Sequence, residues 1–191
     1  GGLLLLLGGG LTALFSSEGN MVIAEGETSN HVDDYFDMEL AFVNTSRDDS
    51  LEYTVFDAPL LNDGNSITYE DLGIHIDIIS HMENVRIESR ISPAEKIYKG
   101  FLKEFVLLPL RPEKEATQNR PGIIIKLSGL SSEKDGIYGI FLGQKTPDTF
   151  QINRDLYFTE FRRKRTYLPF SISLLDFEKI MHPGTNVAKS Y

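Results

Sequence analysis

The chain has 191 residues, of which 41% are hydrophobic and 25% charged, a composition typical of a globular domain rather than a disordered segment. Its formal net charge of −9 argues against nucleic acid as a partner, because phosphates need a basic surface. The absence of cysteine excludes disulfides, thiolate catalysis, zinc–thiolate sites and haem attached to this chain at a Cys-x-x-Cys-His motif.

The N-terminal run Gly1–Phe15 is apolar, rich in glycine and free of charge. It is shorter than the roughly 20 apolar residues of a spanning helix. It also lacks the basic start of a signal peptide and the polar face of a surface helix. Glycine is well tolerated in membrane helices. We therefore expect residues 1–16 to be the second half of a transmembrane helix in a segment of a longer protein. A clipped signal sequence and a core helix are the alternatives.

The flank that follows this run is acidic. Cytoplasmic flanks of membrane helices are usually rich in Lys and Arg, whereas here the first basic residue is Arg47. We therefore expect residues 17–191 to lie on the outer, extracytoplasmic side of the membrane. The acidic residues before Arg47 are Glu18, Glu25, Glu27, Asp33, Asp34, Asp37 and Glu39.

Most of the chain beyond residue 30 alternates with period two, which predicts strands. In residues 73–79, for example, Ile74, Ile76 and Ile78 share one face. Residues 104–110 and 122–127 are continuous apolar runs, typical of strands buried on both faces. The spacing predicts a mainly β, antiparallel sandwich or barrel-like domain. The predicted strands are 35–42, 51–57, 73–79, 85–91, 104–110, 122–127, 137–143, 149–153, 156–163 and 169–174, with 131–136 as a hairpin connection.

Two short segments break this pattern. Residues 93–102 are the only helical candidate after the N-terminal run. Residues 62–65, Asn-Asp-Gly-Asn, carry oxygen donors that could bind calcium, but they lack the EF-hand spacing and its closing Glu, so we interpret them as a turn.

The histidines do not define a site by spacing. His75 and His81 would share a face of one continuous strand with their backbones roughly 20 Å apart, too far for one metal ion unless a turn at Ser80 folds them together. His31 and His182 stand alone. We expect no metal ligand set and no catalytic residue.

Three weaker signals remain. The basic run 162–165 is interpreted as a solvated or edge-strand cluster, with a lipid-headgroup or acidic-partner contact as the alternative. Tyr157, Phe158 and Phe161 could supply part of an aromatic row for glycan binding, but core packing is the favoured interpretation of these rings. A carboxylate pair of the glycosidase type cannot be singled out among 28 acids.

The most specific stretch is residues 167–191. Phe170, Ile172 and Leu174 alternate there, as on a buried strand face, and Pro169 is expected to begin that strand. This stretch resembles the ResB-like family of cytochrome c biogenesis proteins of the system II pathway. The resemblance rests on Leu168, Pro169, Phe170, Asp176, Phe177, Pro183, Gly184, Lys189, Ser190 and Tyr191. The apolar N-terminal run, followed by Gly26 and Glu27 in an expected extended segment, agrees with it.

The resemblance implies a membrane-bound assembly factor for c-type cytochromes, located in the bacterial inner membrane with the bulk of this segment, residues 17–191, on the periplasmic face. It would act with a ResC-type membrane protein to deliver haem to apocytochrome c and attach it there, as a chaperone subunit and not an enzyme by itself. The family's haem-ligating transmembrane His would lie just before Gly1, so haem belongs to the full-length complex and we name no haem ligand within this chain. A membrane-tethered β-sandwich binding module, for example for glycans, is the alternative.

Overall fold

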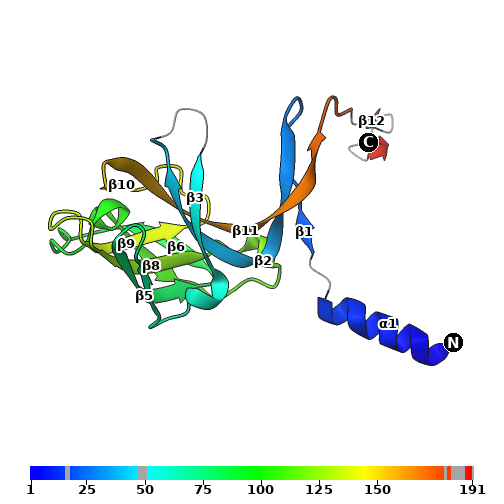
Figure 1. The fold of residues 1–191 in the computed structure, drawn as a ribbon, viewed down its shortest axis with the longest axis horizontal. Helices are drawn as coiled ribbons and strands as arrows, with labels where there is room; N and C mark the ends of the chain where they lie inside the picture. Colours follow the sequence, from blue (N-terminus) through cyan, green and yellow to red (C-terminus); the bar gives the residue numbers. More distant parts are fainter. Residues whose placement is uncertain (16–17, 47–50, 179, 182–187, 191) are drawn as a thin grey trace. The chain divides into compact units, whose positions relative to one another are not determined.

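The structure is a computed structural model that describes residues 1–15, 18–46, 51–178, 180–181 and 188–190 (Figure 1). One α-helix and many strands make up these residues, so the expected mainly β, antiparallel fold is confirmed. The elements in chain order are α1 (Gly2–Phe15), β1 (Gly19–Asn20), β2 (Thr28–Asn44), β3 (Glu52–Asp57), η1 (Ala58–Leu60), β4 (Ser66–Tyr69), β5 (Ile74–Met82), β6 (Val85–Ser89), η2 (Gly100–Lys103), β7 (Phe105–Pro109), η3 (Ala116–Gln118), β8 (Gly122–Ser128), β9 (Gly136–Phe141), β10 (Thr149–Ile152), β11 (Asp155–Ser173), β12 (Ile180–Met181) and β13 (Ala188–Ser190).

The apolar N-terminal run forms helix α1. Its leucines Leu3–Leu6 are each more than three-quarters exposed, which argues against the core-helix alternative. Among the residues described, no helix combines the length and apolar character that crossing a bilayer requires. The assignment of residues 1–16 to the second half of a transmembrane helix therefore remains a prediction.

The chain divides into two compact units. Unit 1 contains residues 1–35 and 165–191, and unit 2 contains residues 36–164. Strands β2 and β11, which are 17 and 19 residues long, each contribute to both units.

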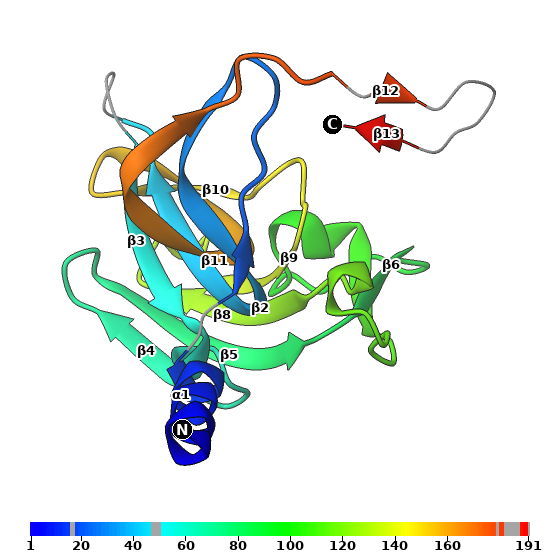
Figure 2. The ribbon, with the colours of Figure 1, turned by 90° about the vertical axis from the view of Figure 1, so that its right-hand side faces the viewer.

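Unit 2 is built from two antiparallel layers, seen edge-on in Figure 2. One layer contains β3, β2, β11 and β10, and the other has the order β4-β5-β8-β9. Alternate side chains of each layer meet in the main core. Its largest fully buried members are Leu40, Phe42, Leu61, Ile74, Ile76, Ile78, Ile123, Ile125, Leu127, Ile140, Phe150 and Phe161.

A second, smaller core covers the opposite face of the β5-β8-β9 layer. It contains Met82, Val85, Leu102, Leu107 and Phe141, drawn from β5, β6, η2, β7 and β9. Apolar groups therefore cover both faces of β8, as its continuous apolar sequence predicts. The predicted β8–β9 hairpin is also confirmed, with Ile123 opposite Ile140.

The prediction of a helix at residues 93–102 is wrong. Only a 3-10 turn, η2, forms, and the residues before it run beside the edge of β9. The backbone N–H of Ile137 donates to Ile97 O at 2.8 Å, and the N–H of Lys99 donates to Ile137 O at 2.9 Å. Pairing with an open sheet edge satisfies these backbone groups outside a helix.

The strands expected at 156–163 and 169–174 are one continuous strand, β11. Pro169 therefore lies inside a strand and does not begin it, which corrects the prediction. β10 pairs with β11 only as far as Phe158. Among the described residues, β2 is the one sheet neighbour of β11 around Pro169. A proline without an N–H is tolerated where one side of a strand is open.

Candidate functional site

Each of the four basic residues 162–165 makes hydrogen bonds or ion pairs with other residues of the protein. Arg162 is 4% exposed, so the solvated-cluster interpretation is wrong for this residue. Arg163 donates from its two terminal nitrogens to the main-chain oxygens of Phe36 (3.1 Å) and Ala116 (3.2 Å). Lys164 pairs with Asp57 at 3.3 Å and Arg165 with Asp33 at 3.4 Å. The run thus ties β11 to its neighbours, and the lipid-headgroup alternative gains no support from it.

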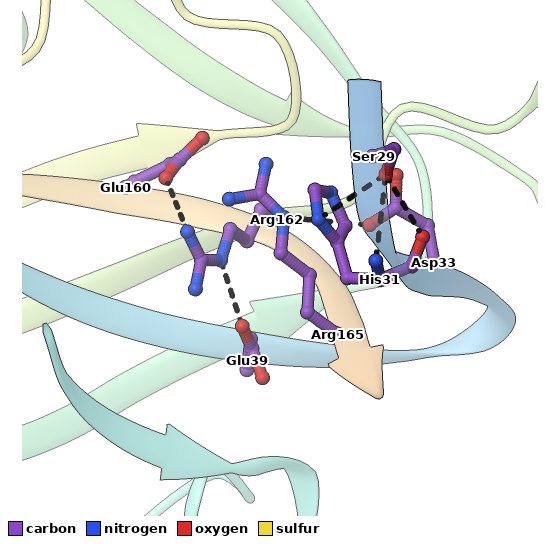
Figure 3. Close-up of polar contacts among 7 residues, drawn as sticks. All are labelled: Ser29, His31, Asp33, Glu39, Glu160, Arg162 and Arg165. Carbon is purple, nitrogen blue, oxygen red and sulfur yellow. Dashed lines mark hydrogen bonds and ion pairs between the residues drawn. The ribbon is translucent and has the colours of Figure 1, made fainter. Parts of the chain in front are cut away.

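Arg162 is the most buried member of the run, and Figure 3 shows it between Glu39 and Glu160. Its Nε donates to Glu39 Oε1 at 2.7 Å, and its Nη1 donates to Glu160 Oε2 at 3.0 Å. Tyr53 lies under the guanidinium, with the ring centroid 4.8 Å from Cζ. Burial opposes the charge of Arg162, but its bonds to the two carboxylates raise its pKa.

His75 and His81 do not share a face, contrary to the expectation for a continuous strand. The register of β5 against β8 shifts between Ile78 and Ser80, which leaves Ile79 as a bulge. Opposite the buried Ile123, His81 faces the main core, where its ring meets Phe161 edge-on at 5.7 Å. His75 points to the other face, beside Thr68 and Asp77. An inserted residue reverses the alternation of a strand, and this separates the two rings.

The other histidines do not join them. His31 lies near Ser29 Oγ (Figure 3). Its ring centroid is 5.7 Å from that of Tyr167. His182 lies outside the described residues. No group of three or more His, Asp or Glu side chains in the described ranges could hold a metal ion.

The second short segment, residues 62–65, forms the predicted turn. The Asn62 and Asn65 side-chain amides donate to the main-chain oxygen of Pro59, and the Asp63 carboxylate accepts the backbone N–H of His81. These contacts use the polar groups as turn and cap interactions rather than as a calcium loop.

His81 borders a cavity of about 350 Å³ within unit 2. Burial lowers the pKa of its imidazole below the usual range, although the carboxylates of Asp63 and Glu83 oppose that shift. The ring is therefore neutral at pH 7. The cavity is lined by Phe36, Asp37, Met38, Ala58, His81, Glu83, Ala116, Asn119, Pro121 and Arg163.

This cavity was not predicted from the sequence. Its residues come from β2, β5, β11, two 3-10 turns and their flanks, and no two of its charged residues are spaced as a motif. The bulge at Ile79 carries no turn residue such as Gly or Pro, so nothing in the sequence marks the reversal of His81.

The two segments that carry the family resemblance are brought together in unit 1. The N–H of Gly26 donates to Leu174 O at 2.7 Å, and the N–H of Leu174 donates to Glu27 O at 3.0 Å. Thr28 and Ser173 share a hydroxyl contact of 2.6 Å. We call the paired residues 26–35 and 165–174 the terminal ribbon, drawn in blue and orange in Figure 1.

The sequence predicts an extended segment at Gly26, but this prediction is wrong. It occupies a turn with φ +82°, just before β2, and the N–H of Glu27 donates back to Ala24 O at 2.9 Å. Only glycine adopts this conformation without strain. The turn sets the start of β2 opposite the end of β11.

The prediction that Phe170, Ile172 and Leu174 form a buried strand face is wrong. Phe170 is 56% exposed and Ile172 45% exposed, and Leu174 lies half-buried just beyond the strand. The alternation is real, but the unit 1 residues described provide no second layer to cover it. Tyr167, at 56%, adds another exposed aromatic ring to the terminal ribbon.

The remaining motif residues are placed as follows. Leu168 is half-buried and Pro169 exposed, while Asp176 and Phe177 lie exposed in an irregular stretch after β11. Ser190 and Lys189 belong to β13, which pairs with β12. Pro183, Gly184 and Tyr191 lie outside the described residues.

The aromatic row proposed for glycan binding is not exposed. Tyr157 and Phe161 are 7% and 2% exposed and belong to the main core, which leaves only Phe158 partly accessible. The phenolic oxygen of Tyr157 also accepts a hydrogen bond from the buried Asn44 amide at 3.2 Å. These rings are packing residues.

Comparisons with known proteins do not place the chain in a family. A scan against protein-family models gives no match. A search of curated proteins likewise gives no significant match.

Proposed function

We propose that this chain is the outer-domain segment of a membrane-bound assembly factor for c-type cytochromes, acting with a ResC-type partner in delivering haem to apocytochrome c. Haem is cargo of the full-length complex in this proposal. The described histidines of this chain are assigned no part in binding it, and the ligand implied by the family resemblance would precede Gly1.

The observation that carries the proposal is the pairing of the two family-like segments. Gly26 and Glu27 lie some 150 residues from Leu174 in the sequence, yet they exchange main-chain hydrogen bonds with it. Two motifs that were matched separately therefore form one structural element. That element carries exposed aromatic and aliphatic side chains, which suit contact with a membrane-embedded partner.

The glycan-binding alternative is not favoured. It depended on Tyr157, Phe158 and Phe161 forming an exposed row, and two of these rings are buried. The part of the chain that the structure describes provides no other observation in favour of glycan binding.

Deleting the gene and staining membranes for covalently bound haem tests the proposal. We expect c-type cytochromes to be lost and b-type cytochromes, whose haem is not covalently attached, to be retained. The wild-type gene supplied in trans should restore the c-type signal. Normal c-type cytochromes in a strain with no second copy of the gene would overturn the proposal.

A further inference from the structure

The cavity beside His81 has a built polar end. The bulge at Ile79 directs the His81 ring to this side of β5, and the contact with Phe161 fixes the ring edge-on. No hydrogen bond joins either ring nitrogen of His81 to another described residue, whereas its backbone N–H donates to the Asp63 carboxylate. A neutral imidazole in this position offers an unused acceptor lone pair.

The charges around the cavity favour a cation. The two terminal nitrogens of Arg163 donate hydrogen bonds to the main-chain oxygens of Phe36 and Ala116, and these bonds connect β2 with η3. Glu83, two residues beyond His81, places an exposed carboxylate on the cavity wall. Asp37 also lines the cavity, where it already has a contact of its own within the fold, so Glu83 is the carboxylate that we assign to the ligand. With His81 neutral, carboxylates outnumber cations in the lining.

The rest of the lining is apolar. Phe36, Met38 and Pro121 provide an aromatic ring, a thioether and a proline ring. An aromatic face attracts organic cations through its quadrupole, and methionine adapts to irregular shapes. A volume of about 350 Å³ suits a small molecule.

We propose that this cavity binds small organic cations of the alkylammonium class. The ammonium N–H groups donate to the His81 imidazole and the Glu83 carboxylate, and the alkyl chain lies against Phe36 and Met38. This site is independent of the proposed role in cytochrome assembly, because its occupant is recognised by unit 2 alone.

A set of isosteric probes tests the charge selectivity. The protein is titrated at pH 7.5 with n-butylammonium, n-butanol and n-butyrate while the NMR signals of the His81 ring are followed. We expect a saturable shift with butylammonium, at an affinity at least about fivefold tighter than with butanol, which corresponds to roughly 1 kcal/mol. Butyrate should bind more weakly than butanol. Equal affinities, tighter binding of butyrate, or no saturation by millimolar butylammonium would each overturn the proposal.

A matched pair of variants locates the interaction. Glu83→Gln should weaken butylammonium binding about two- to fivefold, the range of a partly exposed ion pair. Glu70→Gln removes the same charge from the exposed turn before the far end of β5 and should leave the affinity unchanged. Unchanged binding in Glu83→Gln, or the same loss in both variants, would contradict the assignment. The NMR spectrum of each variant shows whether it is folded.

Discussion

Arg162 shows how much one buried charge can demand of its neighbours. It and Glu39 are 4% and 3% exposed, so neither charge is solvated well, and each depends on the other. Removing one partner of such a pair leaves an uncompensated charge in a poorly polarisable environment. Arg86 and Glu88 form the useful contrast, because they lie at a similar distance, 3.2 Å, with both side chains about half exposed.

We predict that Glu39→Ala lowers the free energy of unfolding by about 3–5 kcal/mol, because Arg162 is left buried with only Glu160 beside it. Glu88→Ala should cost about 1 kcal/mol or less, as exposed pairs do. Urea unfolding followed by circular dichroism measures both. A cost for Glu39→Ala no larger than that for Glu88→Ala would show that the buried pair contributes no more than an exposed one.

His81 should give the protein a pH-dependent stability. Because burial lowers its pKa in the folded state, the unfolded chain binds the proton more tightly. We therefore predict that this contribution to stability is complete above the unfolded value of about 6.5 and is lost as the pH falls toward the folded pKa.

The measurement is the free energy of unfolding at pH 7.5 and at pH 5 for the wild type and for His81→Asn. The two proteins differ only at residue 81, so the difference between the two pH slopes reports the effect of the histidine. The wild type should lose more stability than the variant on acidification. Parallel slopes, or an NMR pKa of His81 above 6.5, would contradict the prediction.

At the scale of elements, Gly139 on β9 allows η2 to approach the sheet. A Cβ built at this position would meet Leu102 at 2.7 Å and Leu107 at 3.2 Å, both members of the smaller core. Interiors are too closely packed to absorb such an overlap without a shift of side chains.

We predict that Gly139→Ala destabilises the protein by about 1–3 kcal/mol, the usual cost of overpacking. Leu102→Ala makes a cavity on its own, but it removes the atoms that the new methyl group would meet. The double variant should therefore cost less than the sum of the two single changes, a coupling that thermal or urea unfolding detects. Strict additivity would mean that the methyl group and Leu102 do not compete for space.

Elements with a regular period were predictable, and irregular ones were not. Ile74, Ile76 and Ile78 alternate into the main core as expected, because one face of β5 is buried over that stretch. The bulge at Ile79 depends on tertiary packing, because it lets residues of β5 pack into both cores. It also places His81 on the face opposite to the one predicted from the sequence. The alternation of Phe170 and Ile172 predicted a strand correctly but its burial wrongly, since periodicity does not reveal whether a second layer exists.

The cavity and the buried ion pair escaped prediction for a related reason. Glu39 and Arg162 lie on strands that are distant in sequence, and each is surrounded by other charged residues that suggest a solvated face. Only the pairing of β2 with β11 in the sheet places them together. When strand pairing brings the residues of a site together, those residues have no characteristic spacing in the sequence, so no sequence motif identifies them.

At the scale of the whole molecule, the terminal ribbon is the feature that combines both ends of the chain. Main-chain hydrogen bonds join Gly26 and Glu27 to Leu174, so the exposed side chains of the ribbon are not what holds these residues together. Phe170 and Ile172 gain little by being apolar in an isolated chain. Such residues are explained more readily by a contact with another surface than by folding.

This leads to a prediction within the proposed function. Phe170→Ser combined with Ile172→Ser should lower covalently bound haem in membranes severalfold while the variant protein accumulates to its normal level. Ile91→Ser is the matched control, because Ile91 is a fully exposed aliphatic side chain in unit 2, at 103%. Both changes replace exposed apolar groups with a hydroxyl and should cost the fold little. Haem staining and immunoblotting of the complemented deletion strain measure the two quantities. Normal c-type cytochromes in the ribbon variant would remove the ribbon from the partner interface, and an equal loss in Ile91→Ser would point to a general effect of exposed apolar residues.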